Sequence, residues 1–209
     1  MLLIEYQYFP PISVIKTSIE ETHIIIPLYE EYRKMSFRNR CMIPTSNGVC
    51  SLTVPLSGGR NNRLILKEVR IDQRMAWQQQ HWRTIYSAYG KSPWFEFYRD
   101  GLEPFFNRDY TFLADWNMEL LHWVFSVIGA KMKIEVRVAE DIFGPENRIF
   151  DLRNKILPKN FQENKWAENG PVYPQVFQEK IGFQSNMSII DLIFCEGKNT
   201  LYSLRKATS

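Results

Sequence analysis

Two arginines on either side of an amide form the group of side chains best suited to bind an anion. Arg38, Asn39 and Arg40 stand together just before a predicted strand. Alternation along a strand places Arg38 and Arg40 on one face and Asn39 on the other. Because forked guanidinium groups match the oxygens of phosphate and carboxylate, two interpretations stand here: an anion-binding site, or a solvated entry to the strand.

A glycine-containing basic run, residues 58–63, is a second candidate. Gly58 and Gly59 would let backbone amides approach an anion, and Arg60 adds positive charge to the same run. A flexible surface turn explains the same composition.

A histidine inside a predicted helix is the candidate general base. Trp77 and His81 share one helix face, at the border of the apolar face. A neutral imidazole there could take a proton from an acceptor, while Trp77 or Tyr89 stacks on a sugar or base and Lys91 adds charge. The alternative is a core-edge histidine that is hydrogen-bonded to a carbonyl group.

Asp191 is a further carboxylate to consider. The spacing Ser188-x-x-Asp191 ahead of an apolar run is typical of a capping box, in which both side chains bond the first helical turn. We favour this structural interpretation over a catalytic one.

Standard catalytic motifs are absent from the sequence, including the phosphate-binding loop, the dinucleotide-binding glycine motif and the nucleophile elbow. The three histidines, His23, His81 and His122, lie far apart in sequence. We therefore expect no metal site, and no cofactor is indicated.

The charge distribution favours an anionic ligand. The chain carries 26 Lys and Arg against 23 Asp and Glu, a net charge of +3. Residues 31–99 hold 12 basic and 4 acidic residues, or +8, so the remainder sums to −5. This segment predicts a partner such as a sugar nucleotide, or simply an uneven surface. Nucleic acid is not expected, because no recognised binding module accompanies the charge.

Cysteine usage and hydropathy indicate a cytoplasmic chain. Cys41, Cys50 and Cys195 show no metal-binding spacing, and an odd number argues against a disulfide framework. The N-terminal residues lack the features of a signal peptide. The longest apolar stretch, 112–128, contains several polar and charged residues, so no membrane span is predicted.

The elements that must position these residues predict a mixed α/β fold in a single domain, 1–209. Strand 2–9, helix 12–19 and strand 23–28 form a parallel βαβ-like unit. A β-rich segment follows, with a hairpin that turns at Asn47-Gly48 and an extended stretch at 64–71.

The C-terminal half is predicted to be mainly helical. Asp72 and Asp109 are expected to cap two of its helices. The apolar face of the first is assigned to Met75, Trp82, Ile85, Tyr86 and Tyr89. The expected elements are helices 72–89, 94–106, 109–128 and 145–158, strand 132–138, loop 160–171 and two short helices in 188–206.

An ordered set of short segments resembles the WbqC-like protein family and covers nearly the whole chain. The segments are Tyr8–Pro11, Tyr32–Arg40, Leu52–Pro55, Trp77, Gln80–Trp82, Ser87–Pro93, Gln175–Phe177, Gly182-Phe183 and Ser188–Leu192.

This bacterial family takes its name from an O-antigen gene cluster. The resemblance implies a role in surface-polysaccharide biosynthesis, as a transferase acting on an activated amino sugar. Arg38, Arg40 and Arg60 would then hold phosphate and His81 would deprotonate the acceptor. The alternative function is a non-catalytic binding or scaffold protein that uses an exposed aromatic surface, for which 94–98 is the candidate.

Overall fold

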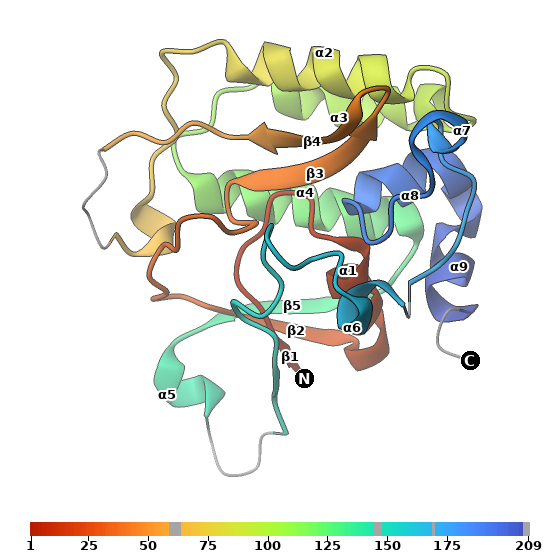
Figure 1. Ribbon diagram of the computed structural model, residues 1–209. Helices are drawn as coiled ribbons and strands as arrows, with labels where there is room; N and C mark the ends of the chain where they lie inside the picture. The colour runs from red at the N-terminus through yellow and green to blue at the C-terminus, as the bar shows by residue number, and fades with distance from the viewer. Residues whose placement is uncertain (59–63, 144–147, 169, 207–209) are drawn as a thin grey trace.

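Four parallel strands form the main sheet, in the order β5-β2-β1-β6 (Figure 1). The computed structural model describes residues 1–58, 64–143, 148–168 and 170–206. The strands are β1 (Leu2–Leu3), β2 (His23–Pro27), β5 (Lys133–Arg137) and β6 (Phe150–Asp151). Strand β1 lies between β2 and β6, so the chain builds one side of the sheet first and then returns to the other.

Helices cover this sheet, and the described chain also contains a two-stranded antiparallel hairpin. The hairpin strands are β3 (Arg40–Thr45) and β4 (Gly48–Thr53). The helices are α1 (Ile12–Glu21), η1 (Leu66–Glu68), α2 (Trp77–Tyr89), α3 (Phe95–Phe106), α4 (Leu113–Ile128), α5 (Ala139–Ile142), α6 (Asn164–Ala167), α7 (Gln178–Ile181), α8 (Ile189–Glu196), η2 (Gly197–Asn199) and α9 (Thr200–Lys206). The mixed α/β class and the parallel βαβ unit are confirmed.

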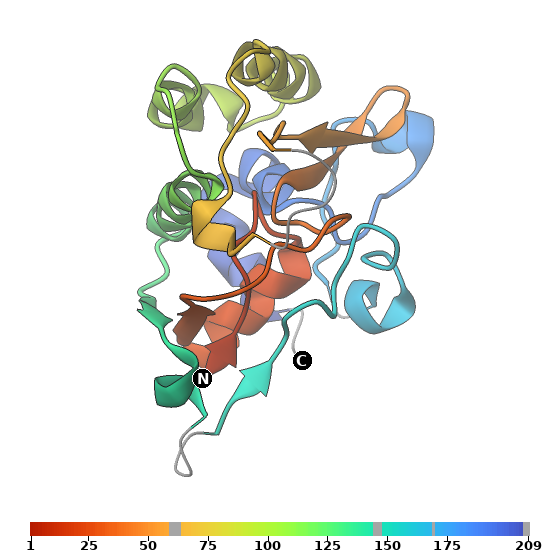
Figure 2. The ribbon, with the colours of Figure 1, turned by 90° about the vertical axis from the view of Figure 1, so that its left-hand side faces the viewer.

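The strands of the sheet are apolar on both faces, as expected for a covered parallel sheet. Leu2 and Ile24 are fully buried in the cluster that contains the apolar side of α1. Leu3 and Ile25 point the other way and pack with Ile142 of α5. Figure 2 shows α1 and α5 on opposite sides of the strands.

The main core is centred on aromatic rings between the hairpin and helices α2, α3 and α4. Trp116 of α4 is fully buried. Its ring centroid lies 5.0 Å from Tyr110, 5.2 Å from Trp77 and 5.3 Å from Phe106. The hairpin itself forms as predicted, with Gly48 at φ +109°, a conformation that glycine adopts at little cost.

Two predicted helix caps are wrong. Asp72 does not cap α2, because its carboxylate instead accepts hydrogen bonds from the backbone and guanidinium of Arg74. The helix begins at Trp77. In the same way α4 begins at Leu113, after Phe112 at the N-cap, and not at Asp109. A short acidic side chain can bond a nearby turn as well as a helix end, so its type does not decide between them.

Residues 148–158 do not form the predicted helix. They contain β6, which pairs Phe150 with Leu2 and Asp151 with Leu3. Pro145, expected at the helix start, lies outside the described residues. Other differences are smaller: only Leu2–Leu3 of the first strand is paired, η1 interrupts the extended stretch 64–71, and α6 lies within the predicted loop 160–171.

The apolar face of α2 is rotated from the predicted one. Its buried residues are Trp77, His81, Ile85, Ala88 and Tyr89. Two residues assigned to the face are exposed, with Met75 at 57% and Tyr86 at 49%. His81 therefore lies in the middle of the buried face.

We predict that Gly197→Ala destabilises the fold by about 3 kcal/mol. A Cβ at this position would overlap the indole ring of Trp94, and the residue has φ +56°. Overpacking and a left-handed backbone together account for that magnitude. Urea denaturation measures it.

Gly129→Ala is the matched control. Gly129 ends α4 at φ +71°, and a Cβ at this position would meet no neighbour within 4 Å among the described residues. The variant should lose only the conformational part, about 1 kcal/mol. Equal losses in the two variants would contradict the packing role assigned to Gly197.

Candidate functional site

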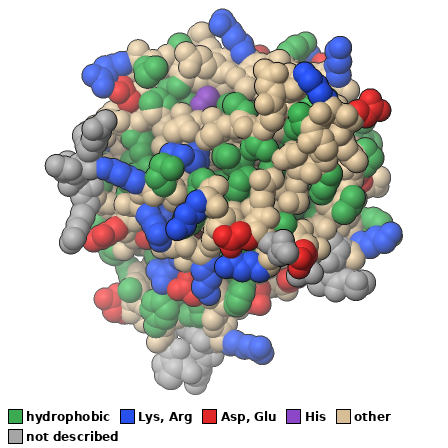
Figure 3. Space-filling model, in the orientation of Figure 1, with side chains coloured by type: hydrophobic (Ala, Val, Ile, Leu, Met, Phe, Trp, Pro, Cys, Tyr) green, Lys and Arg blue, Asp and Glu red, His purple; other side chains and the backbone are tan. Residues whose placement is uncertain are grey.

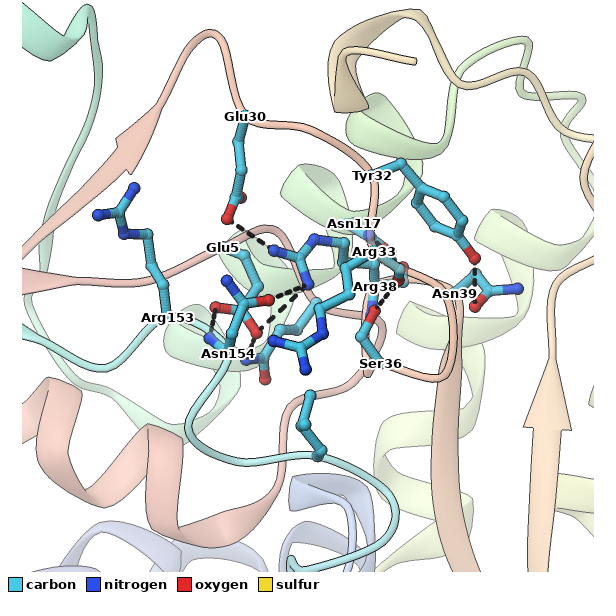
Figure 4. A network of polar contacts seen from close by, with 12 residues as sticks. Glu5, Glu30, Tyr32, Arg33, Ser36, Arg38, Asn39, Asn117, Arg153 and Asn154 are labelled. Atoms are coloured by element: carbon cyan, nitrogen blue, oxygen red, sulfur yellow. Dashed lines mark hydrogen bonds and ion pairs between the residues drawn. The ribbon is translucent and has the colours of Figure 1, made fainter. Parts of the chain in front are cut away.

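Polar side chains gather where the parallel strands of the main sheet end. Glu5 follows β1, Glu30 follows β2, and Asn154 follows β6. The carboxyl ends of adjacent parallel strands meet at one edge, where open α/β sheets bind their ligands. Arg38, from the loop between β2 and β3, reaches into this group (Figure 4). We call Glu5, Glu30, Arg38 and Asn154 the strand-end network.

Arg38 is the centre of the strand-end network, and its side chain is fully buried. Its Nη2 donates to Glu30 Oε1 at 2.6 Å, and its Nη1 donates to Asn154 Oδ1 at 3.0 Å. Glu5 Oε1 lies 3.8 Å from Nη1. One guanidinium thus joins the ends of three strands.

Neighbouring groups hold these side chains in place. Glu5 accepts hydrogen bonds from Gln7 Nε2 and from the backbone N–H of Asn154, both at 3.1 Å. Asn117 of α4 donates to the carbonyl oxygen of Arg38 at 2.7 Å. The network is therefore rigid on its inner side.

Several buried atoms of this group have no hydrogen-bond partner within the described part of the chain. They are Glu30 Oε2, Gln7 Oε1 and Arg38 Nε. A buried polar atom left unpaired costs about 1–3 kcal/mol. A buried polar group of this kind can be satisfied by water or by a polar ligand.

The electrostatics around Glu30, whose side chain is 8% exposed, shift its pKa upward. Burial raises the pKa of this carboxyl, and the charge of Glu5 raises it further, although Arg38 and Arg153 oppose both. Two carboxylates share one buried guanidinium, so the inner network carries an excess negative charge. A carboxyl with a raised pKa beside a buried cation is a candidate acid or base.

Basic side chains surround the acidic centre. Arg153, 26% exposed, is held by two hydrogen bonds to Asp151, and its charge acts on both Glu30 and Glu5. Arg33 is exposed and its side chain lies over the network in Figure 4. Figure 3 shows Lys and Arg side chains gathered on this face, below the hairpin. An anion approaching this face would meet positively charged side chains, which we call the positive rim, around the negatively charged carboxylates of the network.

The predicted run Arg38-Asn39-Arg40 is brought to this edge. Asn39 Nδ2 donates to the Val54 carbonyl at 2.9 Å, and Asn39 Oδ1 accepts from the Tyr32 hydroxyl at 3.1 Å. The charges of Arg40 and Arg38 both act on Tyr32 and lower its pKa, against the larger effect of burial, which raises it. Arg38 itself has no solvent exposure, so in this structure it contacts protein groups.

The candidate base His81 lies elsewhere, in the aromatic core. Its Nδ1 is 3.0 Å from the Tyr8 hydroxyl, and its ring also bonds the backbone of Thr53. Burial lowers the pKa of His81 to about 4 despite the Thr53 bond. Trp77, 2% exposed, packs edge-on against this ring at 5.2 Å. This environment matches the carbonyl-bonded alternative stated above.

The other predicted site residues are dispersed. Tyr89 is fully buried against Phe194, with ring centroids 5.0 Å apart. Lys91 is exposed in the turn after α2. Arg60 lies outside the described residues.

Asp191 is neither a cap nor accessible. Ser188 is at the N-cap position of α8, but its hydroxyl donates to the Phe9 carbonyl at 3.0 Å. Asp191 Oδ2 accepts from the Tyr173 hydroxyl at 2.6 Å and from Gln175 Nε2 at 2.7 Å. Burial raises the pKa of Asp191 to about 6. The predicted capping box is therefore wrong, because tertiary partners take both side chains.

Sequence reasoning missed Glu30 and gave Glu5 no role. In the structure both closely follow a short apolar strand of the βαβ unit, but Glu5 lies within the strand predicted at 2–9, and only Glu30 follows a predicted strand. For Glu30, the position directly after a predicted strand is the feature of the sequence that could have identified it. Within the described ranges, no group of three His, Cys, Asp or Glu side chains is arranged to bind a metal ion.

We predict that His81 makes stability depend on pH. The pKa in the folded protein, about 4, lies below the unfolded value of about 6.5. The unfolded chain therefore binds a proton first, and stability is lost as pH falls from 6.5 to 4. The loss from this site is about 3 kcal/mol. Urea unfolding at several pH values should show that the free energy of unfolding depends less steeply on pH in His81→Gln than in the unchanged protein.

His122→Gln is the control, because His122 is exposed on α4. This variant should show the same dependence of unfolding free energy on pH as the unchanged protein. An unaltered slope in His81→Gln would refute the buried, neutral state of this ring.

Asp191 is predicted to act in the opposite direction. Its folded pKa, about 6, exceeds the ordinary value of 3.8, so the folded state holds the proton more tightly and stability is lost as pH rises from 4 to 6. Asp191→Asn should remove this loss and gain about 3 kcal/mol relative to the unchanged protein across that interval. Asp141→Asn, a change at an exposed carboxylate, should leave the free energy of unfolding unchanged. If the free energy of unfolding plotted against pH runs parallel for Asp191→Asn and the unchanged protein, the prediction is contradicted.

Comparisons with known proteins agree with the resemblance seen in the sequence. A model of the WbqC-like protein family matches residues 7–157. The chain is 30% identical over 189 residues to the uncharacterized protein Rv1507c of Mycobacterium tuberculosis, a match that covers 80% of each chain. No solved structure gives a significant match. The family match includes Glu30, Arg38, Arg153 and Asn154, and it covers more than half of the 209 residues. The chain belongs to the WbqC-like protein family.

Proposed function

We propose that this protein is a cytoplasmic transferase that acts on an activated amino sugar in surface-polysaccharide biosynthesis, with its active site at the strand-end network. Family membership supports the pathway. The free thiols of Cys41, Cys50 and Cys195 support a reducing compartment. Within the described ranges no helix has the length and apolarity needed to cross a bilayer.

The unpartnered oxygen of Glu30 is the observation that carries the proposal. Arg38 and Glu30 Oε1 form a tight pair, which leaves Oε2 with no protein donor among the described residues. That oxygen can accept a hydrogen bond from an amino or hydroxyl group of the substrate and then take its proton. Arg38 is a positioning residue in this scheme, because it orients the carboxylate.

The positive rim supplies the phosphate contacts. Arg33 and Arg153 lie beside the network and reach solvent, and guanidinium groups bind phosphate oxygens in pairs. A nucleotide-activated amino sugar presents both features: phosphates for the rim and an amine for Glu30. His81 has no part in proton transfer here, because its ring is buried, its Nδ1 is paired with the Tyr8 hydroxyl, and burial lowers its pKa to about 4.

The alternative of a binding surface built on 94–98 has less support. Phe97 is 62% exposed, but Phe95 and Tyr98 are buried and Trp94 is half-buried. The aromatic run therefore packs mainly inward and presents a single ring to solvent.

We predict that the protein binds UDP-glucosamine at least tenfold more tightly than UDP-glucose. The amine would form a charge-assisted hydrogen bond with Glu30, and a bond of that kind contributes about 1.5–3 kcal/mol. Glu30→Gln keeps the shape and the contact with Arg38 but should abolish the preference. Isothermal titration calorimetry measures both affinities.

Glu31→Gln is the matched control, because Glu31 is the exposed neighbour in the chain. It should keep the preference. The same preference in Glu30→Gln would refute the role of Glu30. Failure of the unchanged protein to bind either sugar nucleotide would overturn the proposed function.

A further inference from the structure

A second pocket lies beside the strand-end network and has a different character. It measures 560 Å³ and is lined by residues of three segments, 32–39, 53–58 and 64–69, the last of which contains η1. Its residues are Tyr32, Lys34, Asn39, Thr53, Val54, Pro55, Leu56, Ser57, Gly58, Leu64 and Val69. This size is within the range of small-molecule sites.

The inner end of the pocket is rigid and apolar. Val54 is fully buried and Val69 is 2% exposed. The segments are tied to one another by backbone hydrogen bonds, from Tyr32 N–H to the Leu64 carbonyl and from Val54 N–H to the Asn39 carbonyl, both at 2.8 Å. The pocket is thus part of the fold.

Among the described residues of the pocket, Lys34 carries a charge, and most of the remaining side-chain polar groups already have a hydrogen-bond partner. The Ser57 hydroxyl donates to the Ile71 carbonyl, and the Thr53 hydroxyl is paired with Ser51. Asn39 gives one amide hydrogen to Val54 and its oxygen to Tyr32. A side-chain amide has two hydrogens, so Asn39 retains one donor for a ligand.

This balance selects the class of ligand. A nucleobase carries several donors and acceptors, and each one left unpaired in the pocket would weaken binding. An aliphatic chain with one carbonyl oxygen matches the aliphatic walls and the amide donor of Asn39, and the exposed Lys34 also lines the pocket. We infer that this pocket binds the acyl group of an acyl thioester, with the carbonyl oxygen accepting from Asn39 Nδ2.

The position of the pocket fits that role. Arg38 and Asn39 are consecutive, and Figure 4 shows Arg38 in the network and Asn39 beside Tyr32. One peptide unit therefore separates the acyl pocket from the ionic site. The inference goes beyond the proposed function and does not depend on a sugar being the other ligand.

The test uses N-acetylcysteamine thioesters with acyl chains of increasing length from acetyl to octanoyl, titrated calorimetrically into the full chain. The Kd should fall roughly fourfold for each added methylene until the pocket is filled. Leu56→Trp, which fills the pocket from its wall, should weaken hexanoyl binding at least tenfold.

Val49→Trp is the matched control, because Val49 is half-buried on β4 and does not line the pocket. It should bind like the unchanged protein. If circular dichroism shows that Leu56→Trp is unfolded, Leu64→Asn places a polar group on the opposite wall and should weaken binding in the same direction.

Two results would overturn the inference: no saturable hexanoyl binding by the unchanged protein, or displacement of the thioester by uridine at lower concentration. Glu30→Gln should leave thioester binding unchanged. Thioester binding therefore tests the acyl pocket separately from the sugar-nucleotide preference, which depends on Glu30.

Discussion

The buried charge of Arg38 must be compensated, and much of the arrangement around the strand ends follows from that requirement. A guanidinium removed from water is costly unless carboxylates and other acceptors surround it. Here the acceptors come from Glu5, Glu30 and Asn154, which follow three different strands. One ion-pair network therefore sets the position of the loop after β2 relative to the ends of β1 and β6. Asn117 extends the same constraint to α4.

This network is poorly explained by stability alone. Apolar residues of the same volume often stabilise a fold as well as a buried ion pair does. The group also leaves Glu30 Oε2 and Gln7 Oε1 unpaired among the described residues, where a purely structural network would satisfy both. Departures of this kind are expected at functional sites. The basic side chains of Arg33 and Arg153 lie beside this network, and Asn39, next to Arg38 in the chain, lines the apolar pocket.

Local patterns predicted local structure well. The proline turn between two apolar runs indicated the βαβ unit, and Asn47-Gly48 indicated the hairpin, since both signals act within a few residues. The caps predicted at Asp72, Asp109 and Ser188 are wrong, because a short polar side chain can bond whichever partner the fold brings near. Strand β6 has only two residues and exists through its pairing with β1, which no local pattern reveals.

The sequence by itself determined the α/β class, the family resemblance and the basic middle segment, and it singled out the run from Arg38 to Arg40 as a candidate site. Only the tertiary structure decided what these residues do. It buried Arg38 between carboxylates that are far apart in the chain, and it placed His81 among aromatic rings, where protonation is disfavoured. The physical reason is that burial and partner charge set the chemistry of a titratable group. Burial and partner charge both depend on which strand ends meet in the fold. The types and spacing of nearby residues do not show which strand ends meet.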